Sequence, residues 1–297
     1  MNVFLTGGTG LIGSVILNKF YGKSYAISAT YRKIKDENLP IRWIKLDALD
    51  CTEEQVVEMT KNQDVIVHNA ASLKLGVSDE EIKELQKVNI NFTKKLLIAA
   101  SKNNIKKFIF ISTLSGTKKP LPDIITEKSE LDPTTFYAKS KIEGEQLIQE
   151  YAAKSGFNYY IYRISSPVSE LKYLPDTVLR KWIRLSIDNQ PIIVFGNGNR
   201  RQDFVAVSDV ANVVISGIEK ENISGIYNIA SGSSMSMMEV AELIAAKFKT
   251  TIQKCGIDIN ENDKWNVSIE KAKNELSYHP EYSSKQVILN LLQNIVV

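Results

Sequence analysis

The sequence is poor in the residues that build disulfide frameworks and metal sites. Cys51 and Cys255 are the only cysteines among 297 residues, and they form no Cys-x-x-Cys pair. We therefore expect neither a disulfide framework nor a zinc site, and we predict that the protein binds no metal. So few cysteines fit a reducing, cytoplasmic setting.

Long apolar runs and a large excess of one charge are also missing. No apolar stretch approaches the length that spans a bilayer. Met1 is followed at once by a strand-like run, so we expect no signal peptide. The formal net charge is only +3, and the lysines are scattered among glutamates. These features argue against a membrane or nucleic-acid partner.

Short apolar runs alternate with helical segments, which is typical of βαβ units and of a parallel sheet covered on both faces. The expected strands are residues 2–5, 25–30, 41–46, 64–68, 107–112, 157–164 and 225–230, with a short one near 251. The expected helices are residues 11–20, 79–101, 136–155, 236–248 and a terminal one from about 283. A strand followed by a helix is expected over residues 203–219.

This order of elements predicts an α/β protein with a doubly wound parallel sheet and a smaller, mostly C-terminal lobe. After residue 165 the pattern becomes irregular and is interrupted by prolines. We assign residues 1–165, joined by about 203–230, to a unit that binds an NAD(P) cofactor. Residues 166–202 and 231–297 form the expected substrate lobe.

The stretch TGGTGLIG, from Thr6 to Gly13, connects the first expected strand to the first expected helix. Gly7 can supply a tight turn, Gly10 lets a pyrophosphate approach the backbone, and Gly13 lets the helix pack close to the sheet. The helix start offers unpaired N–H groups to phosphates. The alternative is a tight turn without a ligand, but the flanking strand and helix favour a dinucleotide site.

Tyr137 and Lys141 are four residues apart on one expected helix, so the phenol and the ammonium can point the same way. A free tyrosine has a pKa of about 10. A lysine charge and an oxidised nicotinamide favour the phenolate and lower that pKa. Ser112 and Thr113 end the fifth strand, where a hydroxyl can bind a substrate oxygen. The alternatives are a chance pair on a surface helix and hydroxyls that only cap a strand.

Together these motifs resemble the extended short-chain dehydrogenase/reductase family, in its NAD-dependent epimerase/dehydratase branch, which modifies nucleotide sugars. The resemblance covers nearly the whole chain. Besides the glycine stretch and the Tyr137–Lys141 pair, the matching segments are residues 65–71, 88–93, 108–113, 200–211, 225–232 and 268–280.

The resemblance implies a Rossmann fold and a role for each of these residues. Tyr137 would be the acid/base, and Lys141 would hold the nicotinamide ribose and lower the tyrosine pKa. Thr113 would be the catalytic hydroxyl, with Ser112 as its neighbour or substitute. A substrate phosphate would meet one of two arginines, Arg200 or Arg201, unless this pair is a solvated turn. The expected cofactor contacts are Thr6, Gly7, Gly10, Leu11, Ile12, Gly13, Tyr31, Arg32, Asp47, Ala70, Ala71, Asn89, Tyr137 and Lys141.

The segment after the second strand departs from the family pattern. Family members that bind NAD carry an acidic residue there, whereas this chain has Tyr31 and Arg32 and no carboxylate before Asp36. Arg32 could meet the 2′-phosphate of NADP through two N–H groups. We therefore predict NADP or NAD as the cofactor, with a weak preference for NADP.

Two further departures from the family pattern argue against particular reactions. Thr113 is followed by Leu114 and Ser115 rather than by the Asp-Glu pair of the dehydratases, which argues against 4,6-dehydration. The only histidines are His68 and His279. Neither is placed as a second catalytic acid, which argues against epimerase-reductases that need a Cys/His pair.

The predicted activity is hydride transfer between the cofactor and a secondary alcohol or ketone, most plausibly of a nucleotide sugar. A 4-keto reductase and a 4-epimerase both fit. The alternatives are a reductase of a non-sugar carbonyl and a non-catalytic, cofactor-sensing regulatory protein, whose relatives typically lose the Tyr-Lys pair. We also expect a homodimer built from the helices that carry Asn89 and Tyr137.

Overall fold

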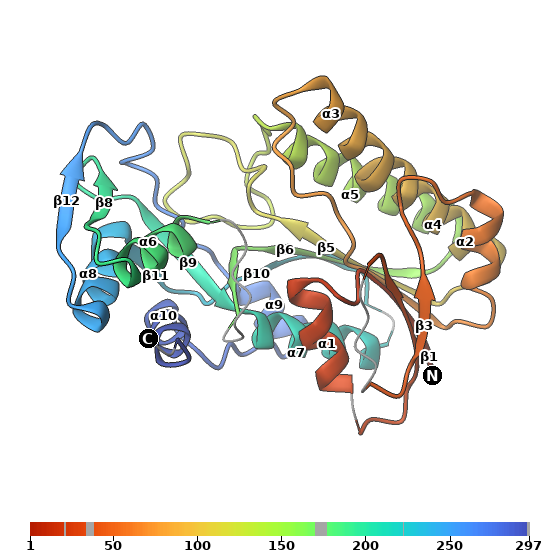
Figure 1. Cartoon of the computed structure of the whole chain (residues 1–297). Helices are drawn as coiled ribbons and strands as arrows, with labels where there is room; N and C mark the ends of the chain where they lie inside the picture. The colour runs from red at the N-terminus through yellow and green to blue at the C-terminus, as the bar shows by residue number, and fades with distance from the viewer. Residues whose placement is uncertain (21, 34–38, 170–176, 222, 296–297) are drawn as a thin grey trace.

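The computed structural model describes residues 1–297 except 21, 34–38, 170–176, 222 and 296–297. Its centre is a seven-stranded parallel sheet in the order β10-β6-β5-β4-β1-β2-β3 (Figure 1). The strands are β1 (Asn2–Thr6), β2 (Ala26–Tyr31), β3 (Arg42–Lys45), β4 (Val65–His68), β5 (Lys107–Thr113), β6 (Asn158–Ile164) and β10 (Gly225–Ile229). The strand order reverses direction between β1 and β4, so the predicted doubly wound sheet is confirmed.

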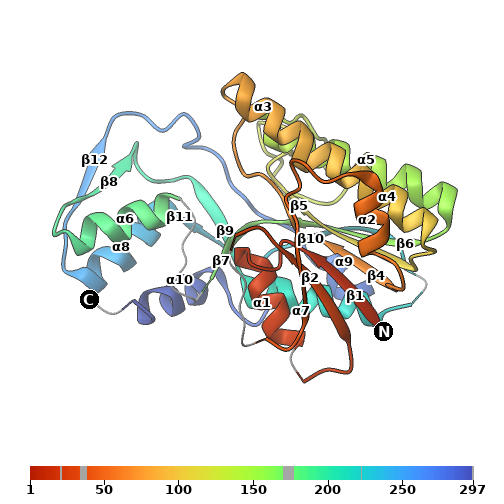
Figure 2. The ribbon, with the colours of Figure 1, turned by 45° about the vertical axis from the view of Figure 1, so that its right-hand side comes forward.

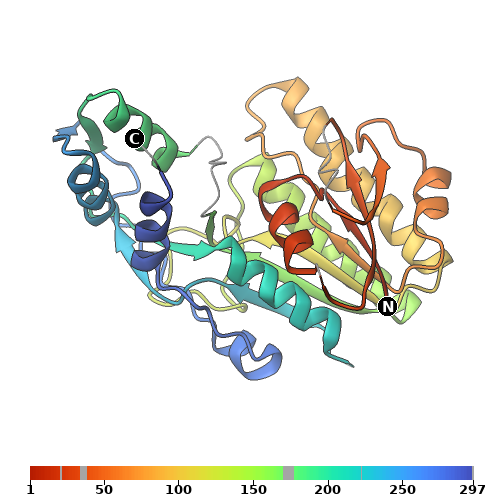
Figure 3. The same ribbon diagram turned by 60° about the horizontal axis from the view of Figure 1, so that its bottom comes forward.

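Helices cover both faces of this sheet, as Figures 1 and 3 show. One face carries α1 (Leu11–Phe20), α7 (Val207–Glu219) and α9 (Glu270–Leu276), and the other carries α2 (Glu53–Met59), α4 (Phe92–Lys102) and α5 (Phe136–Ser155). Side chains of a strand alternate between faces. Val3 and Leu5 therefore enter the core under α1, whereas Phe4 enters the core under α4. Two buried faces explain why the strands are continuous apolar runs.

A smaller lobe lies beside the carboxyl ends of the strands (Figure 2). It contains β7 (Ser166–Val168), α6 (Val178–Ile187), β8 (Ile192–Phe195), β9 (Arg201–Ala206), β11 (Ser234–Ser236), α8 (Met237–Phe248), β12 (Ile252–Cys255) and α10 (Ser284–Gln293). Strands β11, β9 and β7 form one sheet, and β12 pairs with β8 in another. Trp182, Ile244 and Ile288 lie in the separate apolar core of this lobe.

The structure differs in two places from the division that we expected. Helix α9, within the residues 231–297 assigned to the lobe, packs on the large sheet. Residues 203–206 were assigned to the cofactor-binding unit, but they belong to β9, which lies in the three-stranded sheet of the lobe. Helix α7 and strand β10, which follow, do pack into the large sheet. The chain therefore crosses between the two cores at the junction of β9 and α7.

The long helix expected over residues 79–101 is interrupted by a π-helical segment. It consists of α3 (Asp79–Leu85), the π-helix η1 (Gln86–Asn91) and α4. The Thr93 hydroxyl donates to the carbonyl of Asn89 at 2.7 Å, so this side chain takes part in the altered turn. Such π-segments inside α-helices occur frequently at functional sites. Among the described residues, no helix is both long and apolar enough to cross a membrane.

Candidate functional site

The glycine turn between β1 and α1 has the geometry of a phosphate cradle. Gly7 has a φ of +68°, which a residue with a side chain rarely adopts. Thr30, at the end of β2, receives hydrogen bonds from Gly7 N on its hydroxyl at 2.9 Å and from Gly8 N on its carbonyl at 3.0 Å. These bonds hold the turn at the carboxyl edge of the sheet.

Two further glycines shape this cradle. A Cβ on Gly13 would lie 2.1 Å from the carbonyl oxygen of Gly7. Gly13 therefore lets the helix pack closely against the turn itself, whereas we had expected close packing against the sheet. A Cβ on Gly10 would have only two neighbours within 4 Å among the described residues, the Gly7 carbonyl and the Asn69 amide. The outer side of Gly10 is therefore open for a ligand at the start of α1.

Thr6 and His68 support this edge from below. The His68 imidazole makes two hydrogen bonds, from Nδ1 with Thr6 Oγ1 at 2.9 Å and from Nε2 with Thr93 Oγ1 at 2.8 Å. Because the Thr93 hydroxyl donates to a carbonyl, it must accept from Nε2–H, and Nδ1 then accepts from Thr6. Burial holds the pKa of His68 well below its usual value, and the nearby Lys141 charge adds to this effect, so the imidazole is neutral.

The same hydroxyl of Thr6 accepts from the backbone N–H groups of Asn69 and Ala70, at 3.1 and 3.0 Å. Thr6 is fully buried. Its hydroxyl therefore positions the loop after β4, and the expected contact of Thr6 with the cofactor stays a prediction. Ala70 and Ala71 lie on that loop and are partly exposed.

Asn89 is a clamp between this loop and helix α5. It is 2% exposed, its Oδ1 accepts from Ser72 N at 2.8 Å, and its Nδ2 donates to Ser72 O at 3.1 Å and to Ser140 Oγ at 2.9 Å. Both amide hydrogens are thus occupied. Its donors hold Ser72 and Ser140, the residue that precedes Lys141, and the expected contact of Asn89 with the cofactor stays a prediction.

Tyr137 and Lys141 lie one turn apart on α5, whose start is capped by Thr135 Oγ1 accepting from Ala138 N at 3.1 Å. Lys141 is 3% exposed, and its Nζ lies 3.9 Å from the centroid of the Phe110 ring. Burial lowers the pKa of Lys141 to about 7 against the opposing charge of Glu145, and burial raises the pKa of Tyr137 to about 12. Without a ligand, the tyrosine is protonated at neutral pH.

The structure separates the two hydroxyls at the end of β5. Ser112 is buried and donates to Glu145 Oε1 at 2.5 Å. Thr113 points to the opposite face and is partly exposed, and its hydroxyl bonds only to Ser115, at 3.0 and 3.1 Å, among the described residues. Thr113 is therefore the hydroxyl that a substrate can reach, whereas Ser112 belongs to a buried network.

The structure also separates the two arginines. Arg201 donates to Ser234 Oγ at 3.1 Å and to Ser234 O, and lies 3.4 Å from Glu239. Arg200 Nε is buried without a hydrogen-bond partner among the described residues and lies 3.6 Å from Asp258 Oδ2. Arg201 is therefore held by Ser234 and Glu239, whereas Arg200 pairs with Asp258 and faces the cavity described next.

Arg200 lines a cavity of about 210 Å³ in the lobe. The wall residues are Val178, Lys181, Trp182, Ile193, Val194, Phe195, Arg200, Met237, Ile257, Asp258 and Ile259. Phe195 is 53% exposed there, so an aromatic face and two cations are available together. The sequence reasoning missed Phe195 and Lys181, which only the folded chain brings to the arginine.

The end of β2 is one residue later than expected, at Tyr31. The Tyr31 ring contacts Trp43 edge-on at 6.0 Å, and Arg32 follows with an exposed side chain. The pKa of Glu84 is lowered mainly by Lys74, which pairs with it at 2.8 Å, and to a smaller extent by the charge of Arg32, so a carboxylate that already has a partner lies near this arginine. No local sequence signal predicted it, because Glu84 lies at the end of α3. Asp47 is exposed, and its Oδ1 accepts from Leu49 N.

Comparisons with known proteins agree with this geometry. A family model described as the NAD dependent epimerase/dehydratase family matches residues 3–230. A protein of Methanocaldococcus jannaschii, named provisionally as a UDP-glucose 4-epimerase, is 27% identical over 296 residues, covering 96% of this chain and 95% of that protein. The human dTDP-D-glucose 4,6-dehydratase is 27% identical over 261 residues, covering 84% of this chain and 74% of that protein.

A solved structure shares the fold. UDP-glucuronic acid 4-epimerase from Bacillus cereus, in complex with UDP-glucuronic acid and NAD, matches with a TM-score of 0.87 at 20% identity, covering 99% of this chain and 98% of that one. The described part of the chain contains no cluster of three or more His, Cys, Asp or Glu side chains that could hold a metal.

Proposed function

The chain belongs to the NAD-dependent epimerase/dehydratase family, and on that premise we propose that it is a 4-epimerase of a nucleotide sugar. The observation that carries this proposal is the placement of Tyr137 and Lys141 on α5, which packs against the strand that ends at the accessible Thr113. Leu114 is buried and Ser115 bonds to Thr113, so the acid pair of a dehydratase is absent from these two described positions.

The residues present fit a nicotinamide dinucleotide. The open side of Gly10 and the N-terminus of α1 suit its pyrophosphate, and Lys141 suits the nicotinamide ribose. When bound, this cofactor would accept and return a hydride. Tyr137 would take the proton of the sugar hydroxyl and later give it back, while Thr113 hydrogen-bonds the same oxygen. Lys141 would favour the phenolate by its charge.

The nucleotide end of the substrate would occupy the cavity of the lobe. Arg200 and Lys181 both line this cavity and are suited to a diphosphate, although Arg200 Nε lies 3.6 Å from the carboxylate of Asp258 in the same wall. The exposed ring of Phe195 offers a stacking surface for a base. This proposal assigns the phosphate contact to Arg200 instead of Arg201.

The cofactor we propose is NAD, which revises the weak preference for NADP. That preference depended on Arg32, and the carboxylate of Glu84 lies within electrostatic reach of this arginine. Because Glu84 also pairs with Lys74 at 2.8 Å, its opposition to a 2′-phosphate is partial, and the main support for NAD is the related fold. The Bacillus cereus epimerase of the same fold is a complex with NAD. Arg32 keeps the reading of an NADPH-dependent 4-keto reductase open as the second candidate.

We further propose that the protein is a cytoplasmic homodimer assembled through α4 and α5. The family resemblance and the length of α5, 20 residues, support this assembly. The cytoplasmic setting rests on the scarcity of cysteine.

Product analysis tests the catalytic proposal. The purified protein is incubated with UDP-glucose, UDP-glucuronic acid, UDP-N-acetylglucosamine or a UDP-linked 4-keto sugar, with and without added NAD or NADPH, and the sugars are separated by chromatography. A 4-epimerase converts one of them to its C4 epimer without net change of cofactor. Consumption of NADPH in proportion to a 4-keto substrate would instead identify a reductase. If the native protein with NAD bound shows neither epimerisation nor NADPH consumption, both the epimerase and the reductase proposals are refuted.

A further inference from the structure

The cavity of the lobe contains a carboxylate at the place where the proposed function puts a diphosphate. Asp258 lines the same wall as Arg200 and Lys181, and its Oδ2 lies 3.6 Å from Arg200 Nε. The side chains of Arg200 and Asp258 are 29% and 13% exposed, so a solute can reach the pair. A phosphate that enters this cavity therefore meets a negative charge beside the arginine that suits it.

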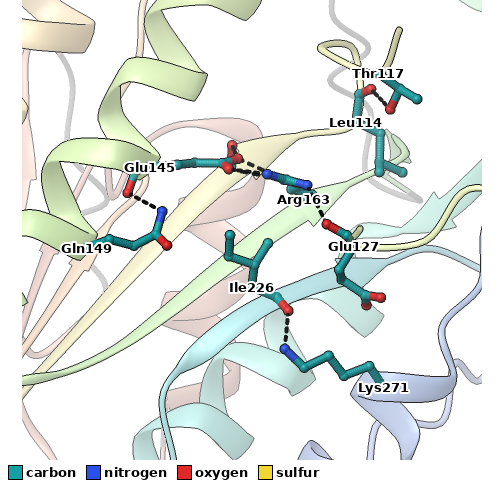
Figure 4. Close-up of polar contacts among 9 residues, drawn as sticks. Leu114, Thr117, Glu127, Glu145, Gln149, Arg163, Ile226 and Lys271 are labelled. Carbon is teal, nitrogen blue, oxygen red and sulfur yellow. Dashed lines mark hydrogen bonds and ion pairs between the residues drawn. The ribbon is translucent and has the colours of Figure 1, made fainter. Parts of the chain in front are cut away.

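The contact between Arg200 and Asp258 is an ion pair without a hydrogen bond from Nε. Its 3.6 Å exceeds the roughly 2.7–3.2 Å of an N–H···O hydrogen bond. The pair of Arg163 and Glu145, between β6 and α5, shows the contrast: Nε donates to both carboxylate oxygens at 3.1 Å, and Nη2 donates to Oε2 at 2.6 Å (Figure 4). Asp258 thus attracts the Arg200 guanidinium without satisfying its Nε donor.

Asp258 is held in the cavity wall by its own segment and not only by Arg200. Its Oδ1 accepts from Asn260 N at 2.9 Å, and its carbonyl accepts from Glu261 N at 3.0 Å. The Glu261 carboxylate in turn accepts from two backbone N–H groups of the turn 197–199, at 3.0 and 2.8 Å. The Asp258 carboxylate is therefore fixed beside Arg200 by bonds that do not involve the guanidinium.

A diphosphate offers Arg200 a better partner than Asp258 does. Charge-assisted hydrogen bonds to phosphate are about 2.7–2.9 Å long and roughly twice as strong as neutral ones. The planar guanidinium can donate two such bonds to one phosphate, and Lys181 in the same wall supplies a second cation. Binding would therefore exchange one anion for another at Arg200. The fixed carboxylate opposes this exchange, because it competes for the guanidinium and repels the phosphate.

We propose that Asp258 is an internal competitor of the nucleotide diphosphate for Arg200 and thereby limits the affinity of the cavity for nucleotides. This inference rests on the part of the proposed function that places a diphosphate in this cavity. The substrate and the product of a 4-epimerase carry the same diphosphate, so a weaker hold on it favours release of the product. Release limits the turnover of many enzymes.

The experiment measures the Kd of UDP for the NAD-loaded protein by titration calorimetry. Asp258→Asn removes the charge but keeps an oxygen that can accept from Asn260 N, so the segment should stay folded. We expect this variant to bind UDP about five- to tenfold more tightly than the native protein. Arg200→Gln should bind UDP about tenfold more weakly. A carboxylate that only orients Arg200 would give the opposite sign, because Asp258→Asn would then weaken UDP binding.

The double variant Arg200→Gln/Asp258→Asn separates competition for the arginine from general repulsion of the ligand. If Asp258 acts by occupying Arg200, Asp258→Asn should tighten UDP binding less in the Arg200→Gln background than in the native one. Asp188→Asn is the matched control. It removes an exposed carboxylate at the other end of α6 from Lys181, and it should leave the Kd of UDP unchanged.

Unchanged or weaker UDP binding in Asp258→Asn overturns the inference, as does an equal gain in both backgrounds or a native protein that does not bind UDP. The measurement needs no turnover, so it can be separated from the test of the reaction. A protein that shows the expected changes in Kd but converts no sugar would refute the 4-epimerase and leave this inference standing. Epimerisation by a protein whose Asp258→Asn variant binds UDP with the native Kd would do the reverse.

Discussion

At the scale of single residues, burial acts against both members of the Tyr137–Lys141 pair. It brings the pKa of Lys141 down to about 7 and that of Tyr137 up to about 12. In the ligand-free protein, therefore, half of the lysine charge is lost near neutral pH and the tyrosine keeps its proton. Ionisation of the tyrosine must then depend on the positive charge that an oxidised nicotinamide would add.

Tyr137→Phe is expected to abolish nearly all turnover and to leave NAD binding intact. A positioned acid/base group contributes roughly 10²–10⁴-fold to the rate, and the substitution removes only the hydroxyl. The measurement is the initial rate of sugar conversion together with the Kd for NAD. Tyr151→Phe, on the same helix, is the matched control and should keep native activity. Near-native turnover of Tyr137→Phe would refute the assignment.

Arg32 and Glu84 decide the choice between NAD and NADP at one point of the surface. We expect the native protein to bind NAD more tightly than NADP, because Glu84, although paired with Lys74, adds a negative charge near Arg32. Glu84→Gln should improve NADP binding several-fold, and Arg32→Ala should weaken NADP more than NAD; one contact of this kind changes Kd by roughly tenfold. Titration calorimetry measures the Kd of NAD and of NADP for the native protein and for each variant. Native preference for NADP would restore the original expectation and favour the reductase.

At the scale of secondary-structure elements, the turn from β1 to α1 is held by backbone contacts that leave no space for a side chain. Gly13 is the tightest point, since a Cβ there would lie 2.1 Å from the Gly7 carbonyl oxygen. The first turn of α1 must therefore shift if any side chain is added. Such a shift would move the N–H groups that face the pyrophosphate.

Gly13→Ala is expected to raise the Kd for NAD roughly tenfold or more, about 1.4 kcal/mol or above. Gly22→Ala is the control. Gly22 lies just after the end of α1 and has a positive φ of +82°, but a Cβ there has no neighbour within 4 Å among the described residues. The Gly22→Ala variant should lose some stability and bind NAD with the native Kd. Equal NAD affinity in Gly13→Ala and the native protein would contradict the proposed cradle.

The elements that sequence reasoning predicted are those with a strong period or a long apolar run. The seven strands of the large sheet were found to within one residue at each end, because both faces of the sheet are buried. Helix α5 was found with its observed bounds, because it has a clear cap and a terminal glycine. The short elements α2, α6, α9, β7, β8 and β11 were not predicted. Most of these segments have too few residues to show a period, whereas α6 carries Leu179, Trp182 and Ile183 at helical spacing and was missed nonetheless.

The site was predicted less completely than the fold, for a physical reason. The local motifs identified the glycine turn, Tyr137 and Lys141, whereas Glu145 and Arg163 meet only when α5 packs on the sheet. The pattern could not separate Ser112 from Thr113 or Arg200 from Arg201. Each of these distinctions depends on a partner far along the chain, such as Glu145 or Asp258.

At the scale of the whole molecule, Asp203 joins the lobe to the large sheet. It is fully buried and accepts from Ser165 Oγ at 2.9 Å, Ser231 N at 2.9 Å and Ser233 N at 3.1 Å. Ser165 directly follows β6, and Ser231 closely follows β10, so this carboxylate ties β9 to the carboxyl edge. The lobe that carries Arg200 is thereby held next to the edge that carries Tyr137, which a substrate spanning both would need.

The surface that we expect to form the dimer is polar, and this decides how strong the dimer can be. Among the described residues, α5 exposes one large apolar side chain, Phe136, and α4 exposes none. The exposed residues of this surface include Lys87 and Lys94 before and on α4, and Glu143 and Glu150 on α5. A two-fold axis along these helices would place the lysines of one protomer near the glutamates of its partner. Such pairs are screened by salt.

We therefore expect a homodimer that dissociates as the salt concentration rises. Sedimentation velocity at micromolar protein should show mostly dimer at low ionic strength and a growing monomer fraction at about 1 M salt, where the Debye length falls to about 3 Å. Glu143→Lys should favour the monomer at low salt, because it turns an attraction into a repulsion. Glu242→Lys, on α8 of the lobe and also exposed, is the matched control and should leave the dimer unchanged. A monomer under every condition would refute the dimer, and a dimer that neither salt nor Glu143→Lys weakens would place its interface elsewhere.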